Sequence, residues 1–182
     1  MARIPLPSPD EMSTDQRRVY DAIVTGPRGR LVGPLRAALH RPELAEKWQQ
    51  LGELLRYRTS LPPMLSELAI LVTAWRCRSN VEWHIHEQIA VGTNLPRSVI
   101  DKVRAGTRPD AEDSDIGVVY DYARELNEHC KVSEPVYQRA LERFGVNGVV
   151  ELTALIGYYT MVAMTLNAHE IPLPDGAKPQ FT

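Results

Sequence analysis

Cysteine is scarce in this chain of 182 residues, which contains only Cys77 and Cys130. Two cysteines cannot build the disulfide framework of a small secreted domain, and no C-x-x-C pair occurs anywhere in the sequence. An excess of charge is lacking too, because 21 basic and 23 acidic side chains give a formal net charge of -2. Such a balance offers no field that attracts a polyanion, so we expect no nucleic-acid partner.

Targeting segments are also missing from the pattern. The N-terminal stretch MARIPLPSPD lacks the apolar core of a signal peptide, and no apolar run is expected to reach membrane-spanning length. We therefore expect no membrane partner and a cytoplasmic location. A hydrophobic content of 43% is ordinary for a globular protein. A length of 182 residues fits a single domain.

Helical signals cover most of the chain, and no segment alternates convincingly with the period of two that a strand requires. Ser13 and Gln16 form a capping-box pattern that starts a helix ending near Gly26. Later helices are expected at residues 35–39, 42–57, 64–76, 81–91, 96–104, 116–130, 134–144 and 147–169, with a polar linker at 105–115. The sequence thus predicts an all-α fold in one domain, residues 1–182.

Two of these helices carry more detailed predictions. One face of helix 42–57 carries five apolar residues at helical spacing: Leu44, Trp48, Leu51, Leu54 and Leu55. Ser133 is expected to cap the helix that follows it, with Pro135 in the first turn, where a missing amide proton costs least.

An acid stands inside the most apolar of the predicted helices. The stretch LSELAILVTAWRCRSNVEWHIHEQIA, residues 65–90, surrounds Glu67 with apolar residues that cover every face of a helix. If the helix is buried, this carboxyl group must be paired or protonated; the alternative is an acid placed in an early turn by the helix dipole. The short connection CRSN folds the next helix back, so a histidine there is a natural acid–base partner.

Polar residues gather again at the start of the next helix. Ser79 and Glu82 match the capping box S-x-x-E. Glu82 and His86 are four residues apart and therefore neighbours on a helix, either as a surface ion pair or as part of a site. His84 and His86 are two residues apart and point to different faces, so they cannot bind one metal ion together. We expect no metal site here.

Glu67, Ser79, Glu82 and His86 together resemble a known pattern. Their spacing is similar to the motif E-x11-C-x2-C-x3-H of the carboxymuconolactone decarboxylase and alkylhydroperoxidase D family, with Ser79 and Glu82 at the two cysteine positions. The resemblance covers a family core of about residues 50–130, between an N-terminal extension, 1–49, and a C-terminal helical part, 131–182. It implies an alkylhydroperoxidase D-like helical bundle that assembles as a homotrimer or homohexamer.

The resemblance also implies a chemistry. Peroxide reduction needs a thiolate that attacks and a second thiol that resolves, so the missing cysteine pair favours the decarboxylase branch, which uses no cofactor. There, Glu67 and His86 are implied as the acid–base pair and Glu82 as the residue that orients or charges His86, on a small carboxylate or lactone substrate. Two alternatives stay open: a thiol peroxidase that uses Cys77 or Cys130, and a catalytically silent oligomeric protein.

The candidates for substrate binding lie mostly outside this cluster. They are Ser79, Arg28, Arg30, Arg36, His40, Tyr158 and Asn167. The basic ones lie in or beside a glycine-bearing loop that can hold an anionic substrate and cover a pocket; the alternative is a solvated basic loop. A carbanion intermediate requires such a shielded, anion-binding pocket.

Overall fold

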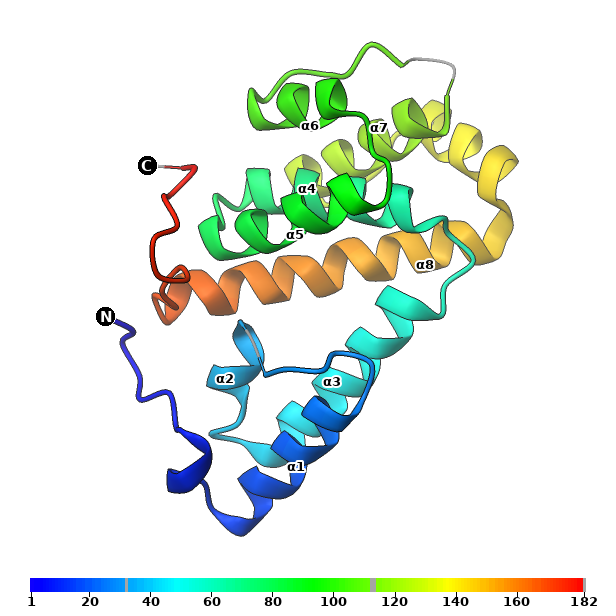
Figure 1. The fold of residues 1–182 in the computed structure, drawn as a ribbon. Helices are drawn as coiled ribbons and strands as arrows, with labels where there is room; N and C mark the ends of the chain where they lie inside the picture. Colours follow the sequence, from blue (N-terminus) through cyan, green and yellow to red (C-terminus); the bar gives the residue numbers. More distant parts are fainter. Residues whose placement is uncertain (32, 112–113, 182) are drawn as a thin grey trace.

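The computed structural model describes residues 1–31, 33–111 and 114–181, and all regular elements in these ranges are helical (Figure 1). They are η1 Pro9–Glu11, α1 Thr14–Thr25, α2 Pro34–Ala38, α3 Pro42–Tyr57, α4 Pro63–Arg76, α5 Asn80–Gly92, α6 Arg97–Arg104, α7 Asp115–His129 and α8 Glu134–Ala168. The prediction of an all-α fold is confirmed. Two residues of the expected linker, 112–113, and residue 32 of the N-terminal loop lie outside the described residues.

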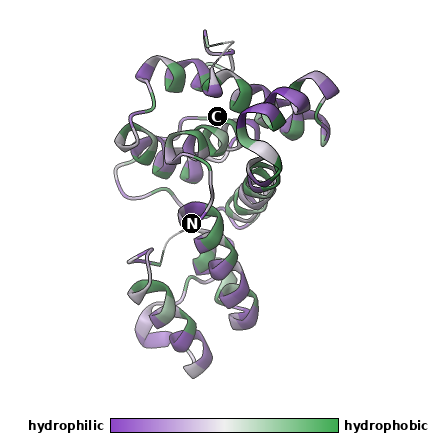
Figure 2. Ribbon diagram, turned by 90° about the vertical axis from the view of Figure 1, so that its right-hand side faces the viewer, coloured by the Kyte–Doolittle hydropathy of each residue, from purple (hydrophilic) through white to green (hydrophobic). Residues whose placement is uncertain are grey.

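Helix α4 forms the centre of the bundle. It packs most extensively against α5, α7 and α8, and its residues 65–74 are all buried. A helix that is apolar on every face is stable only when other helices surround it. Helices α1, α2 and α3 gather below this bundle and reach it through contacts of α2 and α3 with α8 (Figures 1 and 2).

The predicted helix caps have different outcomes. Ser13 caps α1 as expected, because its hydroxyl accepts from the backbone N–H of Gln16 at 3.3 Å and the Gln16 side chain accepts from the Ser13 N–H at 2.9 Å. Ser133 occupies the N-cap position of α8, but its side chain does not cap the helix. Its hydroxyl instead donates to Glu125 of α7 at 3.0 Å. The predicted cap is wrong because a carboxylate from another helix competes for the hydroxyl.

Only part of the predicted apolar face of α3 is buried. Leu44, Leu51 and Leu54 are 51%, 44% and 50% exposed, whereas Trp48 and Leu55 are buried as expected. The buried residues of α3 are Ala45, Trp48, Gly52 and Leu55. The small residues Ala45 and Gly52 take the place of the exposed leucines and let α3 approach the bundle closely. Figure 2 shows hydrophobic residues along this part of the chain as well as in the bundle.

Helix α8 joins two predicted helices, 134–144 and 147–169, into one element with a kink at Gly145, where φ is 65°. Glycine tolerates this left-handed backbone without strain. By length and composition α8 could also cross a membrane, which contradicts the expectation that no apolar run is long enough. Half of that apolar window is buried inside the bundle, as is typical of a core helix.

Candidate active site

A tight turn brings two predicted site residues together. Between α4 and α5, Arg78 adopts a left-handed φ of 50°, and the backbone N–H of Ser79 donates to the carbonyl of Ala74 at 2.9 Å. This turn reverses the chain, so α5 packs along α4. Glu67, in the second turn of α4, and His86, in the middle of α5, therefore face each other.

The two side chains form a buried pair. Glu67 Oε2 lies 2.7 Å from His86 Nδ1, and the side chains are only 8% and 7% exposed. The edge of the His86 ring also packs against Tyr159 of α8, with ring centroids 4.9 Å apart. Because a carboxylate only accepts hydrogen bonds, Nδ1 holds its proton toward Glu67, and Nε2 is left to exchange a proton with a substrate. Among the described residues Nε2 has no hydrogen-bond partner.

Glu82 is buried without a partner. Glu82 lies in the first turn of α5 and is 2% exposed, and neither carboxyl oxygen has a hydrogen-bond partner in the described part of the chain. Burial raises the pKa of the Glu82 carboxyl well above its ordinary value. Burial therefore favours the protonated, uncharged form of the Glu82 carboxyl over the carboxylate.

The predicted capping box of Ser79 and Glu82 is not formed. Ser79 occupies the N-cap position of α5, but its side chain makes no capping hydrogen bond, and its hydroxyl is buried without a partner in the described ranges. Glu82 and His86 are both buried, so they are no surface ion pair. The hydrogen bond that holds the His86 ring is the one from its Nδ1 to the Glu67 carboxylate.

A small cavity of about 50 Å³ opens beside His86 and Glu82. It is lined by Arg28, Gly33, Pro34, Leu35, Arg56, Glu82, Ile85, His86, Tyr158, Tyr159, Val162 and Leu166. Two of the predicted substrate-binding residues, Arg28 and Tyr158, thus lie in the same cavity as the acid–base pair. Arg56 and Tyr159 also line it, although the sequence did not single them out.

Arg28 reaches the cavity from the loop after α1. Its guanidinium Nη2 donates to the hydroxyl of Tyr158 at 3.3 Å. Gly52 of α3 makes room for this contact, because a Cβ there would collide with both the Tyr158 hydroxyl and the Arg28 guanidinium. Burial raises the pKa of Tyr158, so its hydroxyl stays protonated near neutral pH.

Arg56, in the last turn of α3, supplies a second cation. Burial acts to lower its pKa, but the nearby Tyr159, Tyr57 and Glu67 outweigh this effect and raise it. The guanidinium therefore stays charged, and its Nε is buried without a hydrogen-bond partner among the described residues. Arg56 also lines a second hollow, of about 320 Å³, that reaches Glu67. One hollow is thus lined by His86 and the other by Glu67, and Arg56 borders both.

The remaining predicted residues lie elsewhere. His40 is exposed, and its Nε2 is 2.7 Å from the carbonyl oxygen of Pro5. Asn167 donates to the backbone carbonyl of Cys77 at 2.8 Å. Both side chains are thus occupied by contacts within the chain. Arg30 and Arg36 line a separate, larger hollow on the outer side of α5.

Neither cysteine belongs to the lining of the cavity beside His86. Cys77 is half-buried at the end of α4, and burial raises the pKa of its thiol. A raised pKa lowers the fraction of reactive thiolate. Cys130 is exposed at the end of α7, on the residue that closes this helix with a left-handed φ of 54°.

Two solved structures share this architecture. The alkylhydroperoxidase AhpD core of an uncharacterized peroxidase-related protein from Ralstonia eutropha JMP134 superposes with a TM-score of 0.78 at 16% identity, over 96% of this chain and 93% of that one. An uncharacterized peroxidase-related protein from Silicibacter sp. TM1040 gives 0.76 at 12% identity, over 96% and 92%. Neither a protein-family model nor a curated protein sequence matches the chain. The chain thus has the alkylhydroperoxidase D-like fold, in agreement with the resemblance in its sequence.

Proposed function

We propose that the chain is a cofactor-independent enzyme that uses Glu67 and His86 as an acid–base pair on a small carboxylate or lactone, with decarboxylation as the reaction. The observation that carries this proposal is the buried hydrogen bond of 2.7 Å between Glu67 and His86, beside a cavity that two arginines line. A histidine oriented by a carboxylate is a typical general base or acid.

Binding comes first in the proposed reaction. Arg28 and Arg56 attract the anionic group of the substrate, since guanidinium groups bind carboxylates strongly. The protonated Tyr158 hydroxyl offers a further donor. The cavity of about 50 Å³ holds little more than a few atoms, so the reacting group enters it while the remainder of the substrate lies outside. Such a site excludes water from the reacting carbon.

The chemical step is loss of carbon dioxide followed by protonation of the carbon that carried it. The bond between the carboxylate and the neighbouring carbon breaks, carbon dioxide leaves, and the electron pair stays on that carbon as an enolate. The His86 imidazolium, stabilised by the Glu67 carboxylate, donates its Nε2 proton to that carbon and becomes neutral. Solvent then returns a proton to Nε2.

A thiol peroxidase is the second candidate, because the structural neighbours are described as peroxidase-related. Ser79 and Glu82 occupy the two positions at which the family motif has cysteines, and the thiol of Cys77 has a raised pKa. Both facts favour the proposed decarboxylase over a thiol peroxidase.

Turnover assays on a panel of β-keto acids and lactones test the proposal. Carbon dioxide release and incorporation of solvent deuterium into the product would be measured for the wild type, Glu67→Gln and the exposed control Glu43→Gln. We expect release with the wild type and the control, and its loss in Glu67→Gln. Equal turnover of wild type and Glu67→Gln would overturn the assignment, and peroxide reduction that depends on either cysteine would favour the second candidate.

A further inference from the structure

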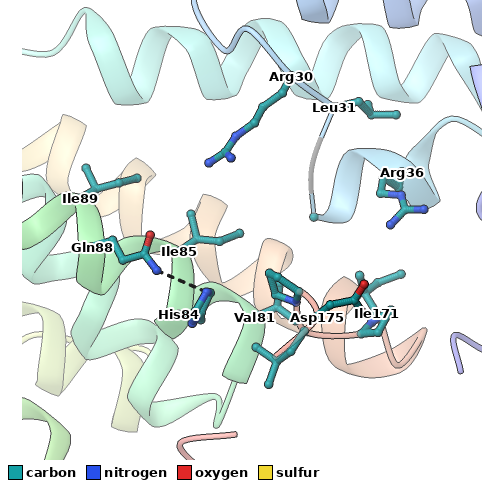
Figure 3. A pocket seen from close by; sticks show the side chains of 14 residues that line it. Arg30, Leu31, Arg36, Val81, His84, Ile85, Gln88, Ile89, Ile171 and Asp175 are labelled. Carbon is teal, nitrogen blue, oxygen red and sulfur yellow. Dashed lines mark hydrogen bonds between the residues drawn. The ribbon is translucent and has the colours of Figure 1, made fainter. Parts of the chain in front are cut away.

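A hollow of about 600 Å³ lies on the outer side of α5. Its walls come from the loop before α2, from α2 itself, from α5 and from the segment that follows α8 (Figure 3). The volume is within the range typical of small-molecule sites. Gly33 and Ile85 line both this hollow and the cavity beside His86, but the proposed reaction does not use it.

One wall of the hollow is cationic. Figure 3 shows the side chain of Arg30 extending from its loop toward α5, and Arg36 descending from α2 toward Ile171. Several other arginines of the chain are ion-paired, such as Arg18 with Glu46. In the described ranges the guanidinium groups of Arg30 and Arg36 have neither an ion pair nor a hydrogen-bond partner. Two unpaired guanidinium groups at a concave surface attract an anion.

The opposite wall is apolar. Val81, Ile85 and Ile89 follow one another at intervals of four residues and form a stripe along α5. Ile171 and Leu173, after α8, continue this surface. Val81 and Ile171 are each only 7% exposed, so the accessible apolar surface comes mainly from the half-buried Ile85 and Ile89. A stripe of this kind binds a hydrocarbon chain, because contact removes apolar surface from water.

The other polar lining residues do not cancel the positive charge. His84 Nε2 lies 3.3 Å from the side-chain nitrogen of Gln88, on the same helix. Asp175 is the one carboxylate among the described lining residues. Two guanidinium groups therefore face one carboxylate, and this excess suits a single negative charge rather than a polyanion.

We infer that this hollow binds an amphipathic organic anion, a medium-chain aliphatic carboxylate. Its carboxylate contacts Arg30 and Arg36, and its chain lies along Val81, Ile85 and Ile89. Binding here requires no chemistry at Glu67 or His86, so the site stands whether or not the proposed reaction is correct.

Calorimetric titration with sodium decanoate tests the charged contacts. The double variant Arg30→Gln/Arg36→Gln is compared with the wild type and with Arg41→Gln, a control at an exposed arginine whose partner is Glu43. We expect decanoate to bind the double variant at least about tenfold more weakly, the effect of losing charge-assisted hydrogen bonds. The control should bind as the wild type does. Unchanged binding in a folded double variant would overturn the inference; the two single variants serve if the double variant does not fold.

A ligand series on the wild type tests the apolar wall independently. From acetate through hexanoate to decanoate, affinity should rise by up to about fourfold per methylene group. Decanol, which has the chain but no charge, should bind more weakly than decanoate. Acetate or inorganic phosphate that binds as tightly as decanoate would reveal a simple anion site, and decanol that binds equally would remove the role of the arginines. Either result overturns the inference.

Discussion

Glu67 and His86 are 19 residues apart in the sequence, yet their side chains meet at 2.7 Å inside the bundle. The turn between α4 and α5 creates this contact, and the T-shaped packing of Tyr159 against the His86 ring supports it. A carboxylate that fixes a histidine ring in a buried site also sets which ring nitrogen exchanges protons with the substrate.

This pair should act as one unit. Glu67→Gln keeps the shape of the side chain but removes the negative charge, and we expect turnover to fall by about 10²–10⁴-fold. His86→Asn should reduce turnover to a similar degree, and the double variant should lose little more, because residues of one unit are not additive. Steady-state kinetics of the three variants provide the check. Losses that multiply in the double variant would show that the two residues act separately.

Glu82 should make stability depend on pH. Its pKa is raised in the folded state and near 4.3 in the unfolded chain, so between these values the folded state binds one more proton. The free energy of unfolding should therefore fall as pH rises above the unfolded value, by up to about 1.4 kcal/mol per pH unit. Glu82→Gln removes this slope, which urea unfolding at several pH values would measure. Parallel profiles for wild type and variant would contradict the burial of an uncharged acid.

Ser79→Ala should not weaken the protein. A capping serine would contribute roughly 1 kcal/mol, but the Ser79 hydroxyl is buried without a partner among the described residues. Its removal should leave stability unchanged or raise it by up to about 1 kcal/mol, as denaturant unfolding would show, and turnover should stay nearly the same. If Ser79→Ala is as inactive as Glu67→Gln, Ser79 is a nucleophile and the enzyme a hydrolase.

The cysteines should be dispensable for turnover. Neither lines the cavity beside His86, and burial raises the pKa of the Cys77 thiol. The double variant Cys77→Ala/Cys130→Ser should keep its activity, apart from a small packing cost at Cys77. Decarboxylation and peroxide reduction would be assayed side by side. A folded double variant without any turnover would restore the peroxidase candidate.

We propose that the exposed apolar face of α8 forms a homo-oligomer interface, in a trimer or hexamer. Val146, Val150, Met161 and Met164 are 68%, 61%, 38% and 64% exposed, and apolar surface of this extent is typical of contacts between copies. Val150→Glu combined with Met164→Glu should dissociate the assembly. Light scattering after gel filtration measures the mass, with Gln138→Glu, beyond the Gly145 kink, as the control. A wild type that runs as a monomer of 20.5 kDa would refute the proposal.

The pattern of apolar residues along the chain is enough to predict the helical class and the burial of Glu67. Apolar residues on every face of residues 64–76 require a surrounded helix, and α4 is indeed central. Local spacing also placed His86 on the returning helix, because a short connection leaves two helices antiparallel. These features depend on residues that are close in the chain.

Which other groups contact this pair depends on how distant helices pack together. Arg56 belongs to α3 and Tyr159 to α8, and nothing in the local sequence marks either residue as part of a site. The packing of these two helices brings both side chains to the cavity beside His86. The same packing overrides the capping pattern of Ser79 and Glu82. Both residues are at the expected positions in the sequence, but their side chains are buried and make no hydrogen bond among the described residues. A capping hydrogen bond contributes about 1 kcal/mol, and the burial of apolar surface around α4 and α5 contributes far more. Packing therefore sets the orientation of the side chains.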